Sequence, residues 1–243
     1  MEHEKFEIGP RIIIKFGDSG VYITETVLFS IIVAAVIAIV CIWSASKLTK
    51  VPSKKQVWAE LVVESLYKLV QGTMGKGAMA YAPYIGTLFL FLLIGSMLGL
   101  LGIRPITADV NTAFAMSGLT FILVQSQAIR SYGVVGKLKE MCHPYPFMFP
   151  LKIIEQVSFP ISLAFRNFGN ILGGFIVLEL AIGALRTASE NLHLPIPLLV
   201  TVIPLPANFF FDMFEPVLQS FIFIMLTMVF ISMEIVIQGE DHS

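Results

Sequence analysis

The chain has 243 residues, of which 56% are hydrophobic and only 14% are charged. A mean hydropathy of +0.82 is more than a soluble domain covers with polar surface, so we predict a polytopic membrane protein of the all-α class. The net charge of −1 gives no indication of nucleic-acid binding, and the two cysteines have no second Cys or His at the spacing of a metal site.

The N-terminal segment, residues 1–25, is expected to lie outside the cell and to be followed by the first membrane span. It mixes acidic and basic residues and lacks the basic-then-apolar order of a cleaved secretory signal. Three stretches of the first half are long and apolar enough to cross a bilayer. They are residues 26–46, 80–103 and 110–129, the third being more polar than the others.

Residues 53–72 lie between the first two spans, and their apolar and charged residues recur with the period of a helix. Trp58 and Leu66 fall on one side of a helical wheel, whereas Glu64 and Lys68 fall on the other. We interpret this as an amphipathic helix on the membrane surface, although a helix packed on a soluble core would show the same pattern.

Basic residues predict the orientation of the spans, because short cytoplasmic loops carry an excess of lysine and arginine. They follow the first and third spans: Lys47, Lys50, Lys54, Lys55, Arg130, Lys137 and Lys139. Five spans then place the N-terminus outside and the C-terminus in the cytoplasm.

The last two apolar stretches, residues 152–185 and 194–237, are too long for simple spans. A helix of 30 residues is about 45 Å long, whereas the hydrocarbon core is about 30 Å thick. Prolines inside the second stretch should also bend it. We therefore expect two long oblique helices, which suit a curved partner.

Arg166 stands in the middle of the first of these stretches. A charge at that depth costs at least about 2.5–3.5 kcal/mol, and a guanidinium does not lose its proton. Residues at helical spacing place it in a polar stripe with Ser162, Asn170 and Gly173. A second stripe is expected on the other helix: Asn208, Asp212, Glu215 and Gln219. Such stripes in apolar helices mark an ion path.

Other interpretations of the arginine remain open at this stage. Arg166 could form a structural ion pair with Asp212 or Glu215. The chain could also be a stand-alone secondary transporter or ion channel, or a scaffold of a membrane complex. It has no phosphate loop, nucleophile triad or metal cluster, so we expect no catalytic site, cofactor or metal of its own.

Three motifs resemble the membrane stator subunit a of the F-type rotary ATP synthases. They are SFPISLAFRNFGNILGG at 158–174, PITADVNTAFAMS at 105–117 and EPVLQSFIFIML at 215–226. The resemblance implies a multi-pass protein of a bacterial plasma membrane. Its implied partners are a ring of small hairpin rotor subunits, a peripheral stalk subunit, membrane lipid and a translocated H⁺ or Na⁺.

In this family two aqueous half-channels that do not meet lead ions to and from the ring carboxylates. The family's essential arginine maps onto Arg166, and its glutamine onto Gln219. The resemblance therefore implies an ion-translocating subunit, whereas the sequence does not choose between H⁺ and Na⁺.

The chain departs from the family pattern beside the arginine and in the outer half-channel. Asn167 stands where leucine is usual, and Phe175 stands where many members have Glu or His. We expect Glu179, one helical turn further on, to take over the part of that missing acid, together with Asp212 and Glu215.

Overall fold

The computed structural model describes residues 12–16, 21–46, 54–101, 103, 105–142, 145–191 and 204–236. Five helices in this part of the chain are long and apolar enough to cross a membrane. This confirms the prediction of an all-α polytopic membrane protein, with one short β-hairpin in addition. The lysine-rich segment 47–53 and the stretch 192–203 lie outside the described residues.

The hairpin precedes the first membrane helix and was not predicted. Strands β1 (Ile12–Phe16) and β2 (Val21–Thr24) pair in antiparallel fashion. Strand β2 runs directly into α1 (Glu25–Ala45), where the Thr24 hydroxyl accepts a hydrogen bond from the backbone N–H of Val27. This side-chain cap satisfies one of the free N–H groups at the start of α1.

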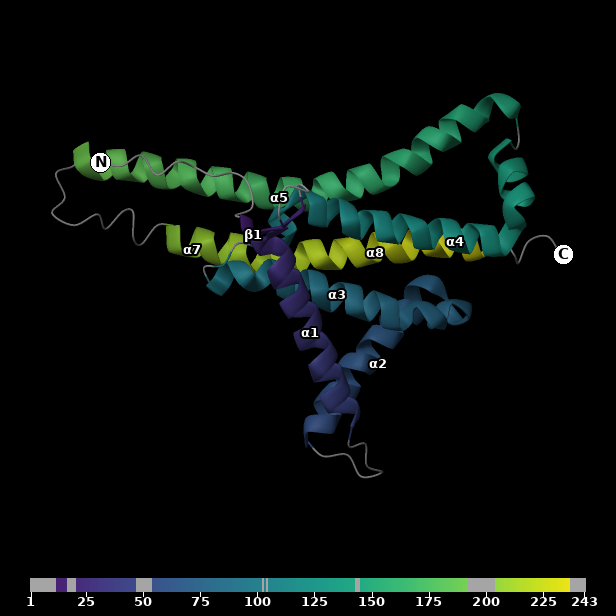
Figure 1. Ribbon diagram of the computed structural model, residues 1–243, viewed down its shortest axis with the longest axis horizontal. Helices are drawn as coiled ribbons and strands as arrows, with labels where there is room; N and C mark the ends of the chain where they lie inside the picture. The colour runs from purple at the N-terminus through teal and green to yellow at the C-terminus, as the bar shows by residue number, and fades with distance from the viewer. Residues whose placement is uncertain are drawn as a thin grey trace.

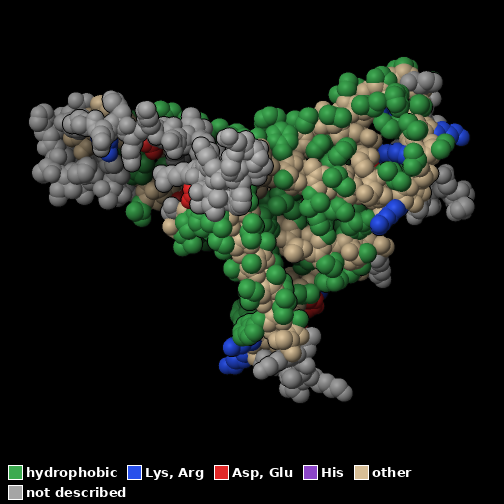
Figure 2. Space-filling view, viewed as in Figure 1, with side chains coloured by type: hydrophobic (Ala, Val, Ile, Leu, Met, Phe, Trp, Pro, Cys, Tyr) green, Lys and Arg blue, Asp and Glu red, His purple; other side chains and the backbone are tan. Residues whose placement is uncertain are grey.

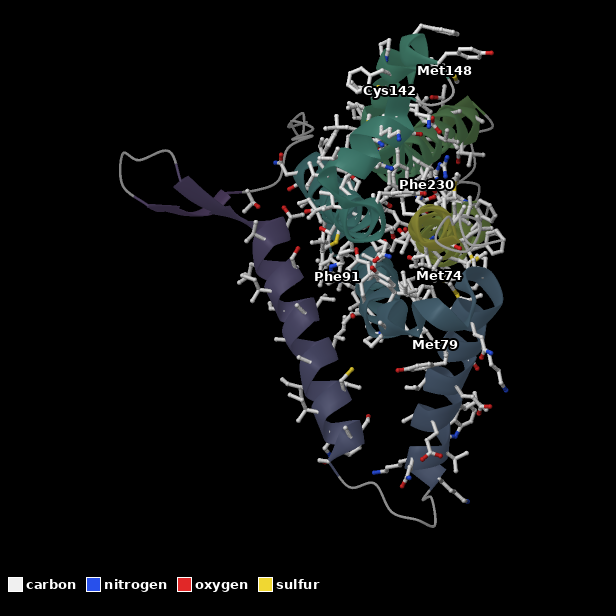
Figure 3. The ribbon with its side chains drawn as sticks, turned by 90° about the vertical axis from the view of Figure 1, so that its right-hand side faces the viewer. Met74, Met79, Phe91, Cys142, Met148 and Phe230 are labelled. Carbon is white, nitrogen blue, oxygen red and sulfur yellow. The ribbon has the colours of Figure 1, made fainter. Side chains whose placement is uncertain are left out.

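Helices α1 and α2 (Lys54–Met74) project away from the other helices, on the same side of the molecule (Figure 3). The N-terminal half of α2 leaves large apolar side chains uncovered, and Trp58 is 71% exposed. Its C-terminal end is different, because Val70 and Met74 are buried in the main core. The prediction that α2 lies on the membrane surface therefore applies to its exposed N-terminal half and stays a prediction.

The main core lies where α3 (Ala82–Met97) packs against α8 (Glu215–Val236). Ile85 and Leu92 of α3 meet Phe223 and Met228 of α8 in one cluster of fully buried side chains. Short 3₁₀ turns flank α3, namely η1 (Lys76–Tyr81) and η2 (Leu98–Leu101). This core fixes α8, which carries Glu215 and Gln219 of the second predicted stripe.

Helix α4 (Val110–Cys142) follows a 3₁₀ turn, η3 (Ile106–Ala108), and continues beyond the predicted end of the third span at 129. Asp109 caps its first turn by accepting a hydrogen bond from the backbone N–H of Asn111 at 3.0 Å. Gly133 breaks the helix with a φ of 70°, a left-handed conformation that glycine adopts without strain. Lys137 and Lys139 therefore belong to a helical extension rather than to a loop.

Helix α5 (Phe149–Asn191) has 43 residues and follows a single 3₁₀ turn, η4 (Pro146–Met148). The last helical stretch consists of α7 (Pro204–Phe209), the π-helical turn η5 (Phe210–Phe214) and α8. In Figure 1, α4, α5 and α8 run along the long axis of the molecule, whereas α1 crosses it steeply. At 1.5 Å per residue the axis of α5 is about 65 Å long, about twice the thickness of a hydrocarbon core of about 30 Å.

Hydrophobic side chains are spread over the described part of the face shown in Figure 2. Basic side chains gather at its right-hand end and at its lower tip. At the tip, Lys55 at the start of α2 lies 5.1 Å from the centre of the Trp43 ring at the end of α1. Basic residues gathered at the ends of an otherwise apolar face are typical of a protein embedded in lipid.

Candidate functional site

The candidate site lies where α5 runs antiparallel to η5 and α8. Three contacts fix their register. The rings of Phe159 and Phe230 have centroids 3.8 Å apart, and the side-chain amide of Asn170 donates to Oε1 of Gln219 at 3.0 Å. Further along, the carboxylate of Glu215 lies against Gly174. Residue numbers therefore rise along α5 as they fall along α8.

Helix α5 has a buried face and an open face at the level of Arg166. Leu163, Ala164 and Asn167 are buried against the other helices. Ser162, Arg166, Gly169, Asn170 and Gly173 are all exposed on the other side. This arrangement confirms that the residues predicted for the first polar stripe share one face.

The open face carries little bulk, and the arginine has no partner there among the described residues. A Cβ added to Gly169 or Gly173 would meet no atom within 4 Å. Arg166 forms no hydrogen bond or ion pair with any residue that the structure describes. The alternative of a structural ion pair with Asp212 or Glu215 is therefore not supported, and Arg166 is free to meet a group of another chain.

Asn170 and Gln219 form the polar contact next to Arg166. Gln219 is only 3% exposed, and its Oε1 accepts the hydrogen bond from Asn170. Its Nε2 is buried and has no hydrogen-bond partner among the described residues. A buried donor of this kind calls for a water molecule or a bound group to accept from it.

Asp212 and Glu215 turn toward different neighbours. A Cβ at Gly99 of η2 would lie 3.3 Å from Oδ1 of Asp212, whereas a Cβ at Gly174 of α5 would lie 3.1 Å from Oε2 of Glu215. The prediction that the residues of the second stripe share one continuous face is wrong here. The reason is the π turn, because its extra residue rotates the preceding helix by about 100° relative to the following one.

Asn208 and Glu179 lie farther from Arg166. Asn208 is half-buried in α7, and Glu179 is exposed on α5. Neither forms a hydrogen bond or ion pair with a described residue. Glu179 lies thirteen residues beyond Arg166, or about 20 Å along the helix axis.

Sequence reasoning did not anticipate the burial of Asn167. This side chain is 2% exposed, and its amide nitrogen has no partner among the described residues. The sequence showed only that asparagine stands at 167 where leucine is usual. The structure shows that the amide of Asn167 points into the protein.

A second unforeseen feature is a chain of polar contacts at the far ends of α4 and α8. Tyr81 donates to the side-chain oxygen of Gln127, whose amide donates to Ser131. Ser131 donates to the backbone carbonyl of Glu234, and Lys137 pairs with the Glu234 carboxylate at 2.8 and 3.0 Å. No pattern in the sequence connects residue 137 with residue 234.

No cluster of three His, Cys, Asp or Glu side chains that could hold a metal occurs among the described residues. Asn170 instead pairs with Gln219 and Glu215 lies against Gly174 between α5 and α8, whereas Asp212 lies against Gly99. Fold and site together define a polytopic membrane protein with polar contacts between two of its long helices.

The ATP synthase A chain family matches residues 27–232. The chain is 34% identical over 232 residues to the sodium ion specific ATP synthase subunit a of Propionigenium modestum, covering 88% of this chain and 75% of that one. It is 30% identical to ATP synthase subunit a of Protochlamydia amoebophila, with 90% and 83% covered. Over their full lengths it is 27% identical to the subunit a of Oceanobacillus iheyensis.

The chain therefore belongs to the ATP synthase subunit a family. It is an ion-translocating stator subunit of the membrane sector, so the alternatives of a stand-alone transporter, channel or scaffold are set aside.

Proposed function

We propose that this subunit provides two offset aqueous half-channels and an essential arginine, Arg166, that faces the carboxylates of a rotor ring. The observation that carries the proposal is the open face of α5. Arg166 is exposed there, has no partner among the described residues, and is followed by Gly169 and Gly173, which keep the surface free of bulk. A passing helix with a buried carboxylate could approach this surface closely.

The chemistry of arginine suits this role better than that of any other side chain. Its charge is permanent, so it attracts a deprotonated carboxylate in a medium of low dielectric without becoming neutral itself. The same charge repels a cation that would cross directly between the half-channels. The ring carboxylate offsets the cost of about 2.5–3.5 kcal/mol for holding the arginine at this depth.

The outer half-channel is proposed to follow the carboxylates of the two oblique helices. Glu179, Asn208 and Asp212 stand at its mouth, Glu215 lies further in, and Asn170 with Gln219 forms the last polar contact before Arg166. Ser162 lies one turn beyond the arginine and is assigned to the inner side. Carboxylates suit this wall because they attract cations and pass protons on.

The orientation proposed from the basic residues places the N-terminus outside and the C-terminus in the cytoplasm, in a bacterial plasma membrane. The partners are a ring of hairpin subunits and a peripheral stalk subunit. The translocated ion is H⁺ or Na⁺. The relative from Propionigenium modestum is named as sodium ion specific, so transport should be measured with both cations.

Cross-linking to the ring tests which face of α5 meets the rotor. Single cysteines replace Gly169 on the open face and Ala164 on the buried face, in a chain without Cys41 and Cys142. The ring subunit of the same complex carries a cysteine one turn from its carboxylate. We expect a disulfide with position 169 and none with position 164. Cross-linking at 164 alone would overturn the proposed orientation of α5.

A further inference from the structure

Glu215 lies against the one glycine of α5 that is closely packed. A Cβ at Gly174 would lie 2.7 Å from Cδ1 of Phe211 and 3.1 Å from Oε2 of Glu215. At Gly169, Gly173 and Gly183 of the same helix a Cβ would meet nothing within 4 Å. Only at position 174, therefore, does the absence of a side chain make room for a carboxylate from the neighbouring helix.

We propose that Glu215, seated on Gly174, supplies the acidic ion-path group that this chain lacks at position 175. The inference rests on the proposed function and revises the sequence expectation that Glu179 takes this part. Position 175 immediately follows the glycine on which the Glu215 carboxylate rests. The carboxylate of Glu215, which belongs to α8, therefore lies at the same height along α5 as position 175.

The π turn explains why Glu215 reaches α5. Pro216 has no N–H, so the usual α-helical bond to the carbonyl of Asp212 cannot form. The N–H of Glu215 instead bonds to the carbonyl of Phe210, five residues earlier. The extra residue in this turn separates the directions of the two carboxylates, so that Asp212 lies against Gly99 and Glu215 lies against Gly174.

Position along the path also favours Glu215 over Glu179. Gly174 lies eight residues beyond Arg166, about 12 Å along α5, whereas Glu179 lies about 20 Å away. Gln219 stands one turn inward from Glu215, and its buried Nε2 has no partner among the described residues. A water molecule between Glu215 and the arginine could accept a hydrogen bond from this donor.

The test compares ion-driven ATP synthesis by the assembled complex in sealed vesicles, with H⁺ and with Na⁺ gradients. Glu215→Gln should lower the rate about tenfold or more, and Glu179→Gln should lower it less. Glu155→Gln, an exposed position near the start of α5, should leave the rate unchanged. The second substitution Phe175→Glu, placed in the Glu215→Gln chain, should restore a large part of the rate.

Restoration by Phe175→Glu would show that an acid at this level is what was lost. Amounts of complex in the membrane are compared by immunoblot, so that a failure to assemble is recognised. The inference is overturned if Glu215→Gln keeps more than half of the rate, or if Phe175→Glu restores nothing in an assembled complex. Arg166→Ala is measured in parallel: if it also synthesises ATP, the proposed function itself fails.

A second measurement does not depend on activity. A cysteine at position 215, in a chain without Cys41 and Cys142, should react with a small water-soluble thiol reagent added from the outer side. Gly174→Ala should slow that reaction by filling the space beside position 215, whereas Gly183→Ala should not. Equal labelling rates in the two alanine variants would argue against Gly174 as the seat.

Discussion

The ion pair between Lys137 and Glu234 joins the end of α4 to the end of α8. Lys137 Nζ lies 2.8 and 3.0 Å from the two carboxylate oxygens, and the side chains are only 10% and 16% exposed. Breaking a buried pair by removing one partner costs about 3–5 kcal/mol, because the other charge is left uncompensated. Both side chains still reach solvent, so Lys137→Met should lower the free energy of unfolding by about 3 kcal/mol.

Unfolding of the purified subunit in mixed detergent micelles measures this loss. The control is Lys139→Met, an exposed lysine on the same helical extension, which should change stability by less than about 0.5 kcal/mol. Lys137 makes further contacts, so a double-mutant cycle with Glu234→Gln isolates the pair itself. The reasoning is refuted if Lys137→Met is no more destabilising than Lys139→Met, or if the cycle gives no coupling.

Three other predictions follow from local geometry and topology. Gly133→Ala should lower the free energy of unfolding by about 1–2 kcal/mol, because φ is 70° at this position. Gly118→Ala, at an open helical position, should raise it slightly. Equal effects of the two substitutions on unfolding in micelles would contradict this prediction. Asp109→Ala should cost about 1–2 kcal/mol by removing the cap of α4 and the 2.8 Å hydrogen bond from Thr26, and Asp109→Asn should cost less; the reverse order would be inconsistent with capping. Tags at the two chain ends should be reached by protease from opposite sides of sealed vesicles, and protection from the same side would exclude the proposed topology.

The number and class of the long helices could be predicted from hydropathy because a bilayer requires long uninterrupted apolar helices. The position of Arg166 on a polar face also followed from helical spacing alone. Ser162 and Asn170 are exposed together with the arginine, as the 3.6-residue period requires. In a regular α-helix, spacing along the sequence determines which residues share a face.

The irregular elements could not be predicted in the same way. Spacing rules assume an unbroken α-helix, whereas the π turn before Pro216 directs Asp212 and Glu215 to different helices. The hairpin before α1 is short, and its two apolar runs were interpreted as part of an outer segment. A separation of ninety-seven residues likewise hides the pairing of Lys137 with Glu234, since no periodic pattern connects them.

Ion-driven ATP synthesis by complexes that carry Arg166→Ala tests the central claim most directly. The complex is assembled in sealed vesicles, supplied with an ion gradient and a membrane potential, and compared with the unaltered complex at equal amounts of this subunit. The account predicts that synthesis is abolished, since only a permanent positive charge on the open face of α5 both attracts the ring carboxylate and bars direct passage of ions. Synthesis at a near-normal rate by assembled Arg166→Ala complexes would contradict it.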